Sequence, residues 1–137
     1  MRFMIIVKAT ADTEAGTLPT EAFVAPMASY HDELAKAGVL LDANALQPTS
    51  RGWRIRYAGG KCSIIDGPFP HYRDLIARYT LIQVRSREEA MEWARRFPPP
   101  QGPHADGEIE VRQLFEWDHS TPCGSAENPH AMASLRA

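Results

Sequence analysis

His31, Asp42 and Asp66 are the residues of this sequence best suited to move a proton. A histidine titrates near neutral pH, and a carboxylate beside it fixes the imidazole tautomer and raises its basicity. Asp66 opens the stretch Asp66-Gly67-Pro68-Phe69, where glycine and proline follow directly on an apolar run. Such residues suit a turn. The stretch is therefore either an ordinary turn or an acid held rigidly at the mouth of a pocket.

The helix expected over Thr20 to Ala37 determines where His31 points. At about 100° per residue, His31 lies at the border of an apolar stripe that consists of Phe23, Met27, Tyr30, Leu34 and Ala37. A partly buried imidazole needs a polar partner, so a boundary histidine bonded to backbone or water is the alternative to a proton carrier. Pro26 is expected to mark the first regular turn, because an interior proline costs about 3 kcal/mol.

Other side chains have the types and positions to contact a ligand. Asp42 follows a short apolar run after the helix, and its alternative role is that of an exposed strand end. His71 and Tyr72 come soon after Phe69 and are close enough in sequence to line the same mouth. Trp53 and Tyr57 alternate along a hairpin and suit a planar ligand, although aromatic stripes more often serve packing. We predict catalytic roles for His31, Asp66 and Asp42 and substrate contacts from Tyr30, Met27, Trp53 and His71.

A sheet is expected from the remaining pattern. Apolar or alternating runs predict strands over residues 2–8, near 39–42, over 79–84 and over 109–115, and a hairpin that turns at Gly59-Gly60. Ser86 and Glu89 have capping-box spacing at the start of a second helix, which ends before Pro98. This order predicts an α+β, ferredoxin-like sandwich with an inserted β-hairpin. No helix remains for the second sheet face, so we predict a homodimer.

Composition limits the classes of function. The chain has 137 residues, a net charge of -2 and 44% hydrophobic residues, so we expect one domain over 1–117 and no nucleic-acid partner. Its apolar runs are too short for a membrane span and its start lacks a signal peptide pattern, which predicts a cytoplasmic protein. Residues 118–137 show no periodicity and are expected to form a flexible or partner-wrapping tail.

Several common site motifs do not occur in the sequence. There is no G-x-G-x-x-G, P-loop or G-x-S-x-G pattern, so dinucleotide, triphosphate and serine-hydrolase chemistry have no motif support. The five histidines form neither H-x-x-H nor H-E-x-x-H, and Cys62 and Cys123 lack C-x-x-C spacing. We expect no cofactor, no metal and no disulfide scaffold.

Several quoted stretches together resemble the YCII-related family, in its DGPF-type branch. They are Asp66-Gly67-Pro68-Phe69, Leu81-Ile82-Gln83-Val84, the SREEAMEWA run from Ser86, the GEIEVRQ run from Gly107 and the YHDELAKAGVLL run from Tyr30. The resemblance covers nearly all of residues 1–116. It implies a dimeric α/β-barrel version of the ferredoxin-like fold.

The resemblance implies less about activity. Many members look like companions of extracytoplasmic-function sigma factors, and the wider family includes a dehydrochlorinase of a chlorinated hydroxyquinol-type aromatic with a proposed His-Asp pair. On this sequence, that histidine falls near Met27, one helical turn from His31, and the aspartate falls near Asp42. After Phe69 the branch resembles AETKE with a later glycine, whereas this chain reads PHYRD and has Arg78. That departure predicts an altered ligand, or none.

Our leading hypothesis is a small-molecule-binding homodimer with a pocket between the first helix and the sheet. His31, with Asp66 or Asp42, would transfer a proton in a lyase-like or isomerase-like step. One alternative is a non-catalytic ligand-binding or regulatory module with a protein partner such as a sigma factor. Another is a purely structural dimer whose helix–sheet interface is filled.

Overall fold

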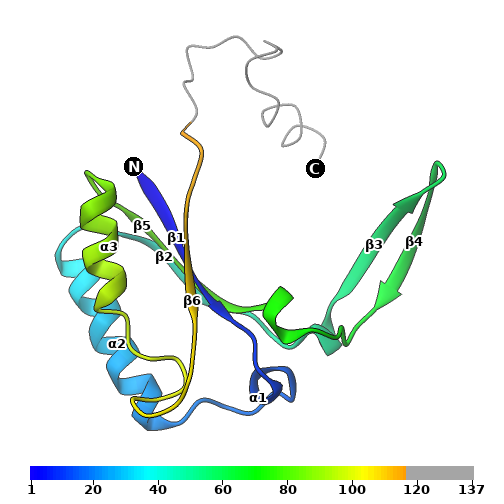
Figure 1. The fold of residues 1–137 in the computed structure, drawn as a ribbon, viewed down its shortest axis with the longest axis horizontal. Helices are drawn as coiled ribbons and strands as arrows, with labels where there is room; N and C mark the ends of the chain where they lie inside the picture. The colour runs from blue at the N-terminus through cyan, green and yellow to red at the C-terminus, as the bar shows by residue number, and fades with distance from the viewer. Residues whose placement is uncertain (117–137) are drawn as a thin grey trace.

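The protein is built on a four-stranded antiparallel sheet. The computed structural model describes residues 1–116, so the expected tail 118–137 and Cys123 lie outside them. The strand order is β2-β5-β1-β6, with β1 spanning Arg2–Lys8, β2 Leu40–Ala45, β5 Ile76–Gln83 and β6 Ile109–Gln113 (Figure 1). Two long helices accompany this sheet, and the strand order is that of a ferredoxin-like fold. The α+β prediction is confirmed.

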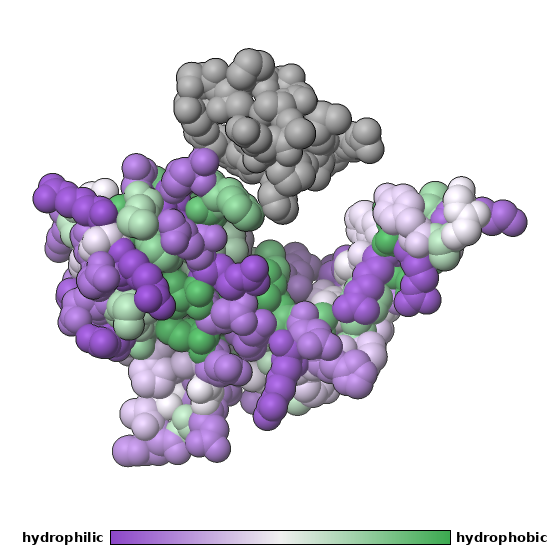
Figure 2. Space-filling model, turned by 45° about the horizontal axis from the view of Figure 1, so that its top comes forward, coloured by the Kyte–Doolittle hydropathy of each residue, from purple (hydrophilic) through white to green (hydrophobic). Residues whose placement is uncertain are grey.

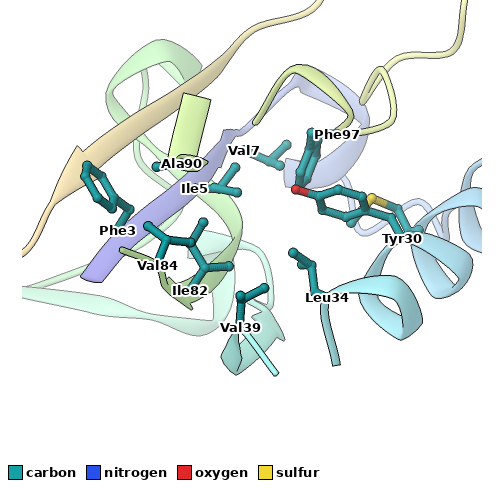
Figure 3. Close-up of a cluster of buried hydrophobic side chains, with 11 residues drawn as sticks. Phe3, Ile5, Val7, Tyr30, Leu34, Val39, Ile82, Val84, Ala90 and Phe97 are labelled. Carbon is teal, nitrogen blue, oxygen red and sulfur yellow. The ribbon is translucent and has the colours of Figure 1, made fainter. Parts of the chain in front are cut away.

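Helices α2 (Glu21–Lys36) and α3 (Arg87–Arg95) pack on one face of this sheet. Register pairs Phe3 with Ile82 and Ile5 with Thr80, so alternate residues of β1 and β5 point toward the helices (Figure 3). Tyr30 ties the two helices together, because its hydroxyl donates to the Trp93 carbonyl at 2.7 Å. The buried cluster consists of Phe3, Ile5, Val7, Met27, Tyr30, Leu34, Val39, Ile82, Val84, Ala90 and Phe97.

Helix α2 differs from expectation at its start. Phe23 N and Val24 N both donate to Thr20 O, so the helix begins at Glu21 and Pro26 lies inside it. The expectation that Pro26 opens the regular helix is wrong, because the turn before it already closes through Thr20. The rest of the helix, including Gly38 in a left-handed conformation after its end, agrees with the sequence pattern.

Helix α3 begins with half of the predicted capping box. Ser86 Oγ accepts from Glu89 N at 3.1 Å, as expected, but Glu89 Oε2 accepts from Arg85 N at 2.9 Å. A short helix, α1 (Ala11–Glu14), lies between β1 and α2 and begins with a reciprocal capping box of Thr10 and Thr13. Among residues 1–116, no helix has the length and apolar character needed to cross a bilayer.

The inserted hairpin forms an arm that projects from the body (Figures 1 and 2). It consists of β3 (Trp53–Ala58) and β4 (Lys61–Asp66), joined through Gly59 and Gly60 at φ values of 58° and 75°. Positive φ at both positions suits a tight hairpin turn. The register places Trp53, Ile55, Tyr57 and Ile64 on one face of the arm, and all four are exposed.

Candidate functional site

His31 occupies the border position that its helical spacing predicts. Its side chain is half-buried, and Nε2 lies 2.8 Å from Thr80 Oγ1. Thr80 is a β5 residue that points into the helix–sheet layer and is 2% exposed. A buried hydroxyl or imidazole without a partner costs about 1–3 kcal/mol. The contact therefore satisfies both groups and fixes the ring against the sheet.

The surroundings of His31 favour its neutral form. Burial lowers its pKa below the ordinary 6.5, and the positive charge of Arg78 lowers it further. The imidazole is therefore uncharged at pH 7. In the tautomer in which Nε2 donates to Thr80, Nδ1 keeps a lone pair that can accept a proton.

Asp42 lies on the opposite face of the sheet from His31. In the β2–β5 register it is paired with Leu81, whereas Thr80 faces the helices. Its Oδ2 accepts from the Tyr79 hydroxyl at 2.9 Å, and its Oδ1 accepts from Asn44 Nδ2 at 3.1 Å. Asp42 is thus part of a polar group on the helix-free face.

Asp66 ends β4, where the arm returns to the body, and its side chain is exposed. Residues 1–116 contain no hydrogen bond between His31 and either Asp66 or Asp42. The imidazole that we expected beside a carboxylate is instead beside Thr80. The catalytic roles of the two aspartates stay predictions without such a contact.

The residues that follow Asp66 hold the arm onto the body. Gly67 N donates to Gly52 O at 3.0 Å, and Phe69 N donates to Thr49 Oγ1 at 3.0 Å. Thr49 belongs to a short 3-10 helix, η1 (Thr49–Arg51), and both its N–H and its hydroxyl bond to the carboxylate of Glu14 in α1. The Arg54 guanidinium carbon lies 3.9 Å from the centre of the Phe69 ring. These contacts favour the turn interpretation of the motif.

The other predicted ligand contacts fall in two places. Met27 and Tyr30 are buried in the core, and burial raises the pKa of Tyr30 to about 12, so its phenol stays a donor to Trp93. Trp53, on the arm, is 63% exposed, and His71, before a second short 3-10 helix η2 (Tyr72–Asp74), is also exposed. None of these four residues lines the two hollows that adjoin His31 and the start of α2.

Those two hollows share Arg78 and Ala45 in their walls. The smaller, of about 120 Å³, is lined by His31, Thr80 and Arg78 with Tyr79 and residues 43–45 of β2. The larger, of about 500 Å³, lies among α1, the start of α2, the end of β2 and the loop near Pro100. Its size is within the range of small-molecule sites, about 300–1,000 Å³. The larger hollow thus lies at the α1 end of the interface between α2 and the sheet, and a small-molecule pocket there stays a prediction.

Arg78 is a residue of both walls to which the sequence assigns no site role, although it marks a departure from the branch pattern. It continues the helix-facing set of β5 that also contains Thr80 and Ile82, and its guanidinium carbon lies 4.7 Å from the centre of the Phe23 ring. Within the described part of the chain it makes neither an ion pair nor a side-chain hydrogen bond. The strand expected from the sequence starts at Tyr79 and so leaves Arg78 out. A strand that starts at Ile76 puts Arg78 on the same face as buried Ile82, which would have indicated an arginine facing the helices.

An antiparallel ferredoxin-like sheet with a hollow beside its first long helix defines a small α+β domain. The chain belongs to the YCII-related family, because the model of the YCII-related domain matches residues 1–118. The resemblance drawn from the sequence is thereby confirmed at the level of the family.

Known proteins similar to this chain include one known from its sequence and one known from a solved structure. An uncharacterized protein of Rhizobium meliloti (strain 1021) is 27% identical over 94 residues, which are 69% of this chain and 74% of that protein. The 5-chloro-2-hydroxyhydroquinone dehydrochlorinase of Burkholderia phenoliruptrix AC1100, solved with 2,5-dihydroxybenzoquinone, is 12% identical with a TM-score of 0.45. That structural comparison covers 88% of this chain and 100% of the dehydrochlorinase chain.

Proposed function

We propose that this protein is a cytoplasmic, small-molecule-binding homodimer in which His31 transfers a proton in a lyase-like or isomerase-like step. The observation that carries the proposal is a neutral, fixed imidazole in the wall of a hollow. A general base must be unprotonated at the working pH and within reach of the bound substrate. Among residues 1–116, no group of three metal-ligating side chains offers a different kind of chemistry.

The positioning of His31 does not depend on an aspartate. Thr80 holds the ring where a carboxylate holds it in a His–Asp pair, but a neutral hydroxyl does not raise the basicity of the imidazole. We therefore propose a base of modest strength, suited to a proton that is already acidic, such as one next to a carbonyl group.

Hydrogen–deuterium exchange tests the proton-transfer step by itself, whatever the complete reaction is. A panel of small ketones, keto acids and quinols is incubated with the protein in D2O, and loss of the C–H signals is followed by NMR. We expect exchange of at least one compound, and a decrease of about 100-fold or more in the His31→Gln variant, since general-base catalysis contributes about 10²–10⁴.

The matched control is His104→Gln, which changes an exposed histidine that lines neither hollow. It should exchange like the wild type. Equal exchange by wild type and His31→Gln would contradict the proton-transfer role, and unfolding of His31→Gln would instead support a structural histidine. Far-UV circular dichroism distinguishes the latter outcome.

The second candidate is a non-catalytic regulatory module that binds a protein such as an extracytoplasmic-function sigma factor. The exposed apolar face of the arm favours it, because Tyr57 is 79% and Ile64 is 70% exposed. Exposed apolar patches commonly mark interaction sites. Under this candidate, Ile64→Glu weakens co-purification with the sigma factor, whereas His31→Gln leaves it intact and no compound exchanges deuterium.

A further inference from the structure

We propose that the larger hollow binds an organic oxyanion, a carboxylate or phosphate on a largely apolar body. The Arg78 guanidinium holds the charged group of this ligand. This inference rests on the proposed function, since it names the chemical class of the molecule bound there. The observation behind it is an unpaired arginine on the helix-facing side of a sheet, in the shared wall of two hollows.

The position of Arg78 is costly unless its charge has a partner. The neighbouring residues in the register, Val7 and Ala45, are small and apolar, and the guanidinium is partly desolvated. A charge that loses water without gaining an opposite charge is unfavourable. Stacking on Phe23 satisfies one flat face of the guanidinium but none of its N–H donors. Those donors match the paired oxygens of a carboxylate or phosphate.

The larger hollow has room for the body of such a molecule. Its walls include the apolar side chains of Phe23, Leu46, Pro48 and Pro100, with threonine hydroxyls among them. Its other charged residues are Asp12 and Lys8, and Lys8 lies 3.7 Å from Glu110. Arg78 is therefore the cation in this wall that has no acidic partner within residues 1–116.

An oxyanion on Arg78 would also change His31. Both side chains line the smaller hollow, and the charge of Arg78 contributes to the low pKa of His31. A bound anion opposes that charge, so the His31 pKa rises on binding. The anchor and the base would thus act on one molecule, with the oxyanion at Arg78 and its neighbouring carbon toward the imidazole.

Four probe compounds test the class of ligand: benzoate, phenyl phosphate, and the uncharged benzamide and benzyl alcohol. Binding to the full chain is measured by ¹H–¹⁵N NMR titration, with the His31 ring protons as a second readout. We expect benzoate or phenyl phosphate to bind at least tenfold more tightly than either uncharged compound and to raise the His31 pKa. Benzoate and phenyl phosphate together distinguish a carboxylate site from a phosphate site.

Arg78→Met keeps an apolar stem over Phe23 and removes the charge, whereas Arg56→Met removes a charge from the exposed arm. The first should weaken anion binding at least tenfold, and the second should have no effect. The oxyanion inference would be overturned if benzoate and benzamide bound equally, or if benzoate bound equally to wild type and to Arg78→Met. Either result would still leave the hollow as a binding site. Binding of none of the four would count against the inference and the proposed function together.

Discussion

The proposed proton transfer depends on the contact between His31 and Thr80. It holds the titratable ring of His31, on α2, against Thr80 of β5 and close to the cation Arg78. Burial and Arg78 act in the same direction, toward the uncharged imidazole. The site is therefore set to accept a proton and to release it readily.

The low pKa of His31 makes the free energy of unfolding depend on pH. Because the pKa of His31 is lower in the folded protein than the ordinary 6.5, the unfolded chain takes up the proton first as pH falls. The contribution of this group is fully present above pH 6.5 and is lost as pH falls through the folded pKa. Urea unfolding at pH 7.5 and 5.5 should show a smaller loss in His31→Gln than in wild type.

The corresponding control is His104→Gln, which alters an exposed loop histidine. It should retain the wild-type loss, because the other titrating groups are unchanged. A His31→Gln variant with an undiminished loss between the two pH values would contradict the assigned environment of the ring.

Sequence reasoning located His31 but not its partners. Its border position follows from helical spacing, which depends on neighbours three and four residues away. Thr80 and Arg78 are 49 and 47 residues further along the chain (80 − 31 and 78 − 31), and only the strand register brings them beside the helix. The predicted roles of Asp42 and Asp66 rest on residue type and sequence position, which do not specify the face of a sheet.

At the scale of elements, the Asp66–Phe69 turn is a junction of three segments. It connects the arm to η1, and η1 is in turn bonded to α1 through Glu14. Gly67 has the least space: a Cβ there would lie 1.8 Å from the carbonyl oxygen of Thr49. The motif needs glycine because another backbone passes close to it.

Gly67→Ala should therefore destabilise the protein, because either the turn or η1 must move. Clashes and lost backbone bonds of this kind cost about 1–3 kcal/mol, measured as the free energy of unfolding in urea. The matched control is Gly52→Ala, where the added Cβ would lie 3.7 Å from the same carbonyl oxygen and φ is −115°. Equal stability of the two variants would contradict the junction.

Local pattern predicted the elements themselves better than their contacts. The hairpin, α2 and α3 are encoded by periodicity and by Gly59-Gly60, all of which are short-range signals. The junction was not predictable, because η1 has no periodic signature and its Thr49 hydroxyl bonds to residues 35 positions before it and 20 after it. The backbone contacts of Gly67 and Phe69 thus account for the Asp66–Phe69 stretch as a turn that joins the arm to the body.

The proposed homodimer depends on the face of the main sheet that points away from α2 and α3. Met4, Ile6 and Leu81 are half-buried at its centre, and Glu110 and Arg112 are paired 3.6 Å apart at one side. An apolar centre with a polar rim is typical of an interface. This arrangement supports the proposed homodimer, in which a second copy covers the helix-free face.

The dimer predicts a change of mass on substitution. Ile6→Glu places a charge at the centre of the face and should convert the dimer to a monomer, as measured by light scattering after size exclusion. Met91→Glu, at an exposed apolar position on α3, is the control and should remain a dimer. A wild-type protein that is monomeric at all accessible concentrations would contradict the proposal.

The tip of the arm is expected to tolerate substitutions and insertions. The two strands of the arm bond to each other and meet the body through one short junction, and Gly59 lines neither hollow, so we expect substitutions near Gly59 to leave the hollows unchanged. If the arm binds a partner and the hollow binds a small molecule, as proposed, the two surfaces can change independently of each other. An epitope or fluorophore placed at Gly59-Gly60 is then expected to report on the proposed binding to the arm without affecting the hollow.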